Sequence, residues 1–546
     1  MESGGSLVAV DWVVIGAYFV AVFGVAIWST WKDHTRDTSA DYFLAGRHVG
    51  WFVIGASLFA SNIGSEHLVG LAGTGAASGV AVGQFEILAS FLLLVLGWVF
   101  VPFYIKSGVY TMPEFLERRY SPATRWYLAL ISIVGYVLTK ISVSIYAGGI
   151  VFESLMGINF WTGALIVVIA TGIYTVFGGL RAVLYTDMFQ MFVLVAGGIA
   201  VTIIGLDKIG GWNALHQAAG PEFFSLWKPM SDPAFPWTGI VFGAPILGVW
   251  YWCTDQFIVQ RVLSAPNVEQ ARRGAIFAGY LKVLPLFIFV IPGVIAYALA
   301  KSGQLALDAP DHALPVLVGA LLPVGIRGLV VGGLLAALMS SLSSVFNSCS
   351  TLVTLDIYKK LHPEASERRL VWVGQISTIV MVVLGLAWIP FMSYISGQLY
   401  QYLQSVQAYI APPIAAVFLF GIFFKRVNGA GAMAAMVSGF VLGMGRLVLE
   451  LNKGSLGDGL LFYIATINFL HFALVLFAVC TGILVVVSLL TRPVPNEQLR
   501  GLTFQTVEKE AAIEGIELEA RGKRLNLGLT VVLLIVVTGV LIYFRG

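Results

Sequence analysis

The stretch Gly55-Ala-Ser-Leu-Phe-Ala-Ser-Asn62-Ile63-Gly64-Ser65-Glu66-His67 decides the fold of this chain. It lies in an apolar segment long enough to span a bilayer, and it runs into a Ser/Asn/Gly cluster near mid-depth. Irregular backbone at that depth is tolerated only where it is buried in protein or lines a cavity. The composition therefore predicts a discontinuous helix whose freed carbonyls face a cavity. The alternative is that Ser and Gly here only allow helices to pack closely.

The composition of the whole chain is that of an integral membrane protein. Of its 546 residues, 58% are apolar and 11% are charged, whereas soluble domains are about 25% charged. We expect an all-α integral membrane protein with about fourteen transmembrane helices of about 20 residues each. The predicted spans lie near 9–30, 50–73, 81–105, 124–152, 160–178, 183–206, 238–262, 274–300, 317–352, 370–392, 400–424, 430–450, 461–490 and 526–544.

The distribution of Lys and Arg predicts the orientation. Most of the 32 Lys and Arg residues fall in alternate loops, among them the loop that contains Arg261. The loops richer in Lys and Arg are expected on the cytoplasmic side. With an even number of spans, both termini then point outward. The only long polar stretch, 492–525, is interpreted as a cytoplasmic linker between helices.

Several classes of function are excluded by missing patterns. The net charge of +3 forms no basic stripe, which argues against nucleic acid as a partner. There is no GxxxxGK[ST] loop for direct ATP drive, and the seven His are scattered without an HExxH motif. We therefore expect neither an enzyme nor an organic cofactor, and no obligate protein partner is evident. Membrane lipid is the expected surrounding.

Ionisable residues inside predicted spans are functional candidates because they are costly in hydrocarbon. Glu86 lies early in the third span, and Lys282 lies in a later one. The alternative is a structural ion pair that binds no ligand. In the seventh span, the aromatic cluster Trp250-Tyr-Trp252 runs into Thr254-Asp255-Gln256. An aromatic belt at the membrane interface is the alternative there.

The ninth span contains the hydroxyl-rich run Ala337-Leu-Met-Ser340-Ser341-Leu-Ser343-Ser344. Hydroxyl and carbonyl oxygens are the ligands that hard cations prefer, so the run is a candidate cation site. Any single Ser can instead bond back to a carbonyl of its own helix.

At Ala60–His67, Trp250–Arg261, Gly279–Lys282 and Asn347–Tyr358, the chain closely resembles the sodium/glucose cotransporters of the sodium/solute symporter family. The resemblance runs from about residue 40 to about residue 495. It implies fourteen helices with two inverted five-helix repeats, which rock to give alternating access. The implied organisation is 1–49 for the first helix and its connector, 50–206 for repeat one, 207–237 for an extracellular loop, 238–424 for repeat two and 425–546 for peripheral helices.

The resemblance also implies sites for Na⁺ as the coupling ion. The first site would use the carbonyls of Ala60, Ile63 and Ala337 and the hydroxyls of Ser340 and Ser341. A candidate second site would use Asp187, Ser343 and Ser344.

A sugar site is implied as well. Its polar and aromatic members would be Asn62, His67, Glu86, Tyr251, Trp252, Lys282 and Gln404, with Phe85 and Tyr400 as walls or gates. Two positions depart from the family's pattern. Gly248 stands where sugar-transporting relatives have Thr or Asn, so one sugar hydrogen bond is expected to be missing or replaced by water. Glu66 differs from the glycine of animal carriers, which favours a bacterial inner-membrane protein.

The expected function is Na⁺-coupled uptake of glucose or galactose. Two alternatives stay open at this point. One is a symporter for another neutral polyol such as myo-inositol, and the other is a sugar-gated channel or sensor that binds sugar without accumulating it.

Overall fold

The computed structural model describes residues 7–31, 43–64, 66–392, 399–506 and 520–546. Within these ranges the regular structure is helical, as predicted, and no β-strand is present. The α-helices are α1 (Ala9–Trp31), α3 (Trp51–Asn62), α4 (Ala72–Ser78), α5 (Gln84–Val95), α6 (Val101–Ser107), α7 (Met112–Arg119), α8 (Pro122–Tyr136), α9 (Ser142–Met156), α10 (Phe160–Ile209), α11 (Trp212–Ala219), α12 (Ala244–Gly248), α13 (Gln256–Leu263), α14 (Val268–Leu281), α15 (Ile291–Lys301), α16 (Ala313–Leu321), α17 (Ile326–Thr351), α18 (Lys359–Leu361), α19 (Glu367–Met392), α20 (Leu399–Phe423), α21 (Gly429–Leu451), α22 (Leu460–Thr466), α23 (Phe469–Leu490) and α25 (Ala520–Tyr543).

Eleven helical segments of the described chain are long and apolar enough to cross a membrane. Shorter apolar helices at Trp51–Asn62, Phe160–Ile173 and Gly239–Thr254 lie in three further predicted spans. The count of fourteen therefore stays a prediction. One boundary differs from expectation: the spans predicted near 160–178 and 183–206 are joined in the single helix α10.

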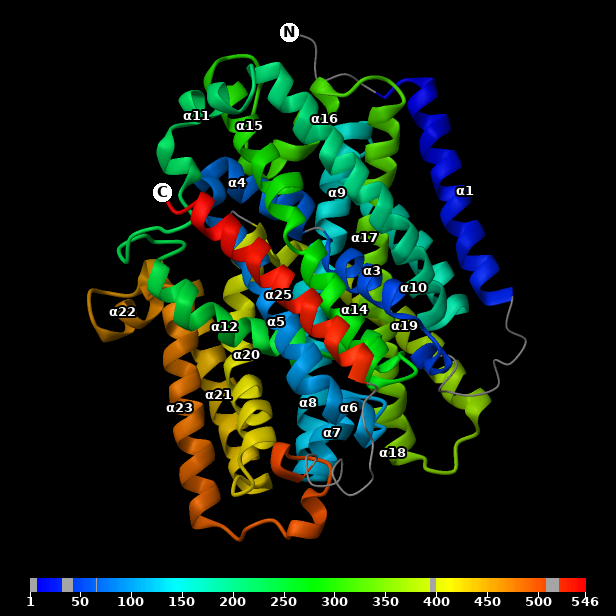
Figure 1. The fold of residues 1–546 in the computed structure, drawn as a ribbon, viewed down its shortest axis with the longest axis vertical. Coiled ribbons are helices and arrows are strands. Elements are labelled where there is room, and N and C mark those ends of the chain that lie inside the picture. Colours follow the sequence, from blue (N-terminus) through cyan, green and yellow to red (C-terminus); the bar gives the residue numbers. More distant parts are fainter. Residues whose placement is uncertain (1–6, 32–42, 65, 393–398, 507–519) are drawn as a thin grey trace.

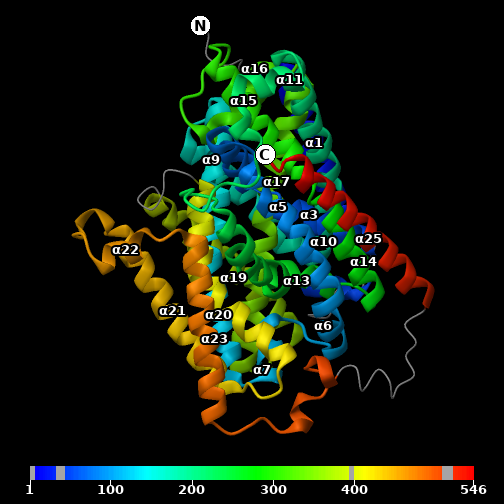
Figure 2. The ribbon, with the colours of Figure 1, turned by 60° about the vertical axis from the view of Figure 1, so that its left-hand side comes forward.

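Burial separates a central bundle from peripheral helices. In the most apolar 18-residue stretch of Ile326–Leu361, which contains α17, 94% is buried inside the protein. The corresponding share for Gly522–Tyr543 in α25 is 17%. Figures 1 and 2 show α25 crossing the outside of the bundle and α21 and α23 projecting at one side. Exposed apolar side chains such as Val20 on α1 and Ile535 on α25 provide the lipid-facing surface.

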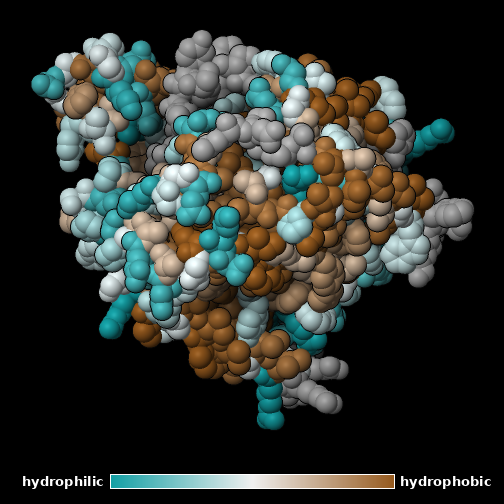
Figure 3. Space-filling view, turned by 90° about the horizontal axis from the view of Figure 1, so that it is seen from above, coloured by the Kyte–Doolittle hydropathy of each residue, from teal (hydrophilic) through white to brown (hydrophobic). Residues whose placement is uncertain are grey.

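Both ends of the described chain lie toward the same end of the molecule (Figure 1). Near the N-terminus, the Asp11 carboxylate pairs with Arg327 at 2.7 Å and accepts a hydrogen bond from the Gly325 amide. Near the C-terminus, the Phe544 carbonyl accepts a hydrogen bond of 2.9 Å from the Leu226 amide. From this end, hydrophilic side chains are interspersed with hydrophobic surface (Figure 3).

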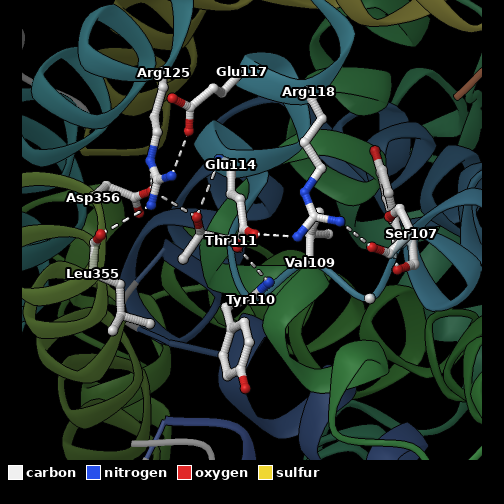
Figure 4. A network of polar contacts seen from close by, with 12 residues as sticks. Ser107, Val109, Tyr110, Thr111, Glu114, Glu117, Arg118, Arg125, Leu355 and Asp356 are labelled. Atoms are coloured by element: carbon white, nitrogen blue, oxygen red, sulfur yellow. Dashed lines mark hydrogen bonds and ion pairs between the residues drawn. The ribbon is translucent and has the colours of Figure 1, made fainter. Parts of the chain in front are cut away.

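A polar network lies toward the opposite end, around α7, α8 and α18 (Figures 1 and 4). Arg125 bridges Asp356 at 2.7 Å and Glu117 at 2.6 Å, and Thr111 donates to Asp356 at 2.8 Å. Partial burial favours the protonated form of Glu117, but hydrogen bonds from Lys360 and Arg125 outweigh it and lower the pKa of this carboxyl. The network joins α7 and α8 to the end of the most buried span.

Two predicted spans are interrupted within their length. Helix α3 ends at Asn62, and Ile63 leaves helical geometry with φ −75° and ψ 84° before the π-helical segment η2 (Glu66–Leu71) begins. The second break is at Asp255, with φ −76° and ψ 128°, between the π-helical segment η8 (Val249–Thr254) and α13. The predicted discontinuous helices are thus confirmed. Each break leaves backbone groups without helical partners.

Close glycine contacts hold the second half of the first broken span. A Cβ on Gly293 of α15 would overlap the carbonyl oxygen of Ala72 in α4. A Cβ on Gly75 of α4 would lie 2.7 Å from the carbonyl oxygen of Val290. Both obstacles are backbone atoms, so the two helices must separate to admit any side chain.

We expect Gly293→Ala to lower the thermal unfolding temperature of the detergent-purified protein, because overpacking costs about 1–3 kcal/mol. The matched control is Gly445→Ala on α21, where a new Cβ meets nothing within 4 Å. Unfolding is followed by intrinsic tryptophan fluorescence. Equal unfolding temperatures for the two variants would show that the α4–α15 contact is not tightly packed.

Candidate functional site

One pocket opens between the two breaks. Seven residues predicted for the sugar site line it: Asn62, His67, Phe85, Glu86, Tyr251, Trp252 and Gln404. They come from α3, η2, α5, η8 and α20, which are distant in sequence. Lys282, directly after α14, reaches this group from behind the lining residues. Two side chains lie outside the part that the structure describes, those of Tyr400 and Glu66.

A buried charged cluster forms the polar side of the pocket. The Lys282 ammonium contacts the Glu86 carboxylate and the Asn62 side-chain oxygen, and it lies 3.3 Å from His67 Nε2. His67 Nε2 is in turn 3.0 Å from Glu86 Oε1. The ion pair between Glu86 and Lys282 is therefore present. Of the pair, Glu86 lines the pocket together with His67, whereas Lys282 is fully buried behind them.

Aromatic rings form the other side of the pocket. Tyr251 and Trp252 are nearly buried, with ring centroids 5.0 Å apart in an edge-to-face arrangement. The Asn62 amide donates a hydrogen bond of 2.7 Å to the Tyr251 hydroxyl. This bond joins the end of α3 to η8, so each broken span contacts the other beside the pocket.

Leu92 is a pocket residue that sequence reasoning missed. It lines the cavity from α5, and a Cβ on Gly248 would overlap its side chain. Leu92 therefore fills the space in which relatives are expected to place the Thr or Asn side chain. Only the three-dimensional packing of α5 against α12 reveals that Leu92 occupies the space beside Gly248.

The residues predicted for the first sodium site lie on α3 and α17 and at the residue after α3, and these two helices pack together. Ala60, Ile63 and Ala337 are fully buried. Ser341 donates a hydrogen bond of 2.9 Å to the Ser61 carbonyl oxygen, which links the two helices directly. The last carbonyls of a helix lack intrahelical partners, so this end of α3 supplies oxygen atoms for a cation.

The candidate second site is only partly assembled as predicted. Asp187 of α10 accepts hydrogen bonds of 2.6 Å each from the Ser57 and Ser61 hydroxyls, and a third from Ser340. The Ser344 hydroxyl lies 3.4 Å from the Ser61 hydroxyl. Ser343 instead donates to the carbonyl of Ser340 on its own helix at 2.9 Å.

Arg261 joins this serine cluster, and sequence reasoning missed it. The Lys and Arg pattern places Arg261 among the loop charges, but its side chain is fully buried in α13. Its guanidinium lies 3.7 Å from Asp187 and donates to the hydroxyls of Ser57 (3.0 Å), Ser61 (2.5 Å) and Ser344 (2.5 Å). The available signal was an ionisable residue at the end of an apolar span.

Comparisons with known proteins agree with this architecture. Two solved structures share the fold. A Na⁺-coupled sialic acid symporter aligns with a TM-score of 0.76 at 21% identity, covering 89% of this chain and 98% of that one. A nucleobase-cation-symport-1 family transporter aligns with a TM-score of 0.56 at 16% identity, covering 86% and 99%.

Relatives with similar sequences identify the family more specifically than the shared fold does. The chain is 41% identical to sodium/glucose cotransporter 4 of Mus musculus, over 91% of this chain and 78% of the relative. It is 40% identical to sodium/glucose cotransporter 1 of Oryctolagus cuniculus (94% and 83%) and 41% identical to the sodium/myo-inositol cotransporter of Mus musculus (91% and 76%). Residues 42–439 match the model of the sodium:solute symporter family. With this match and these identities, the chain belongs to the sodium:solute symporter family.

Proposed function

We propose that this chain is a secondary active, Na⁺-coupled symporter that takes up a neutral hexose, glucose or galactose, by alternating access. One observation carries the proposal. A pocket between two interrupted spans is lined by a buried carboxylate, amides, a histidine and aromatic walls, and the Lys282 ammonium contacts Glu86 and Asn62 from behind this lining. Ligand and ion sites of secondary transporters are typically built at such helix breaks.

The chemistry of the pocket suits a sugar. A neutral pyranose offers hydroxyl donors and acceptors around its ring, while its C–H faces are apolar. Glu86 accepts hydrogen bonds, Lys282 donates them, and the amides of Asn62 and Gln404 do both. Tyr251 and Trp252 would cover an apolar face, and the resemblance assigns Phe85 and Tyr400 as walls or gates. A carboxylate ligand would be repelled by Glu86.

Sodium is the proposed coupling ion, and no organic cofactor is needed. Na⁺ held by Ala60, Ile63, Ala337, Ser340 and Ser341 would bridge α3 to α17. It would thereby order Asn62, which lies between two of these ligands in sequence. Asp187 and Ser344, with Ser343, are proposed for a second Na⁺. A stoichiometry of two Na⁺ per sugar depends on this second site.

A second candidate substrate is myo-inositol, because a relative at 41% identity is a sodium/myo-inositol cotransporter. This cyclic polyol presents the same kind of hydroxyl ring to the pocket. A sugar-gated channel or sensor is the alternative outside symport. We further propose that the Lys- and Arg-rich end faces the cytoplasm of a bacterium, which would place both termini outward.

The proposal is tested with purified protein in liposomes. With Na⁺ outside and a potential of 100 mV, negative inside, the potential alone allows roughly fifty-fold accumulation at one Na⁺ per sugar, and the Na⁺ gradient adds to this. We expect concentrative uptake of labelled glucose or galactose with Na⁺ but not with K⁺ in its place. Competition by unlabelled glucose, galactose and myo-inositol then ranks the three as substrates. Uptake that stops at equal concentrations would indicate a channel, and absence of Na⁺ dependence would refute symport.

A mutant cycle tests the role of the charged pair. We expect Glu86→Gln and Lys282→Gln each to abolish sugar uptake, and the double variant not to recover it, because both ligand groups are gone. A purely structural pair should recover, since no unpaired buried charge remains. The matched control is the Asp11–Arg327 pair outside the pocket, where Asp11→Asn with Arg327→Gln should recover what the single variants lose. Uptake recovered in the Glu86/Lys282 double variant would contradict the assignment.

A further inference from the structure

We infer that the Arg261 guanidinium competes with Na⁺ for Asp187 and is displaced when an ion binds there. The inference rests on the proposed Na⁺ coupling but assigns a role to a residue that this function does not require. Arg261 is a positioning residue here, because it acts on the ion site and not on the sugar.

The charges of the cluster oppose joint occupancy. Asp187 is fully buried, and a buried carboxylate needs a compensating charge. Arg261 supplies that charge at 3.7 Å. If Na⁺ bound beside Asp187 while the guanidinium stayed, the buried cluster would carry a net positive charge.

The two cations also need the same oxygen atoms. The hydroxyl oxygens of Ser61 and Ser344 accept hydrogen bonds from Arg261. A Na⁺ ligand must offer a lone pair to the ion, and Ser61 already accepts from both Arg261 and Ser344, so its two lone pairs are in use while Arg261 stays. The exchange concerns Asp187, Ser61 and Ser344, three oxygen donors from three different helices.

The contact between Arg261 and Asp187 is exchangeable in its geometry. A direct guanidinium–carboxylate bond is about 2.7–2.9 Å long and often bidentate. Here the separation is 3.7 Å, and the serine hydroxyls contact both groups. Displacement therefore breaks hydroxyl contacts that Na⁺ replaces, and it does not break a direct bidentate pair.

The position of Arg261 links the ion cluster to the sugar pocket. Ser61 and Asn62 are adjacent on α3. Ser61 contacts Arg261, which follows the break at Asp255, and Asn62 contacts Tyr251, which precedes it. Release of Arg261 therefore frees α13 from α3 on one side of the break, while the sugar-pocket bond holds the other side.

The test is the binding of ²²Na⁺ to the purified full-length protein without sugar. Arg261→Gln removes the charge and keeps hydrogen-bond donors, whereas Arg261→Lys keeps the charge. We expect Arg261→Gln to add or tighten one Na⁺-binding component by about tenfold, within the usual range of coupling between sites. Asp187→Asn in the same background should remove that component, and Arg261→Lys should leave Na⁺ binding weak.

The matched control is Arg272→Gln on α14. Arg272 is also buried, but it donates to the Gly97 carbonyl and not to the serine cluster. Na⁺ binding should be unchanged in this variant. Unchanged Na⁺ binding in Arg261→Gln, or equal weakening of every component, would overturn the inference.

A measurement on the wild type keeps the inference testable if the Arg261 variants fail to fold. Na⁺ alone should increase hydrogen–deuterium exchange in residues 256–263, because Arg261 no longer anchors α13 to α3. No Na⁺-dependent change there would overturn the inference. Neither experiment uses sugar, so failure of Na⁺-driven uptake would refute the proposed function separately.

Discussion

A helix that stops inside a membrane leaves backbone groups that only the protein itself, or what it binds, can satisfy. This constraint acts at the end of α3, where Ile63 leaves helical geometry. The surrounding helices are arranged to meet it. Helix α17 supplies the Ser341 hydroxyl to the Ser61 carbonyl, and close glycine contacts hold α4 against α15 beyond the break.

The end of α3 serves two sites through neighbouring residues. The Ser61 side chain belongs to the cluster around Asp187, while the next side chain, Asn62, bonds Tyr251 and Lys282 in the pocket. An ion that ordered this turn would therefore alter the proposed sugar pocket without a long chain of intermediate contacts.

The sequence predicted much of this site because polar residues inside apolar spans are conspicuous. Asn62, Glu86 and Lys282 were singled out on that basis, and the structure brings them together. The burial of Arg261 was missed, because counting loop charges treats a basic residue at the end of a span as solvated. That Leu92 occupies the space beside Gly248 depends on packing between helices far apart in sequence. The break at Asp255 falls in the polar run Thr254-Asp255-Gln256, but the residue at which that span stops being helical depends on its packing and could not be read from the sequence.

The central idea is that Na⁺ and sugar bind to one shared turn, and equilibrium binding to the purified protein tests it most directly. Labelled glucose binding is measured with and without Na⁺, and ²²Na⁺ binding is measured with and without glucose. Coupling between two sites is reciprocal, so we expect Na⁺ to raise glucose affinity by the same factor as glucose raises Na⁺ affinity, and this factor to exceed one clearly. A factor of one, with both ligands bound, would contradict a shared turn.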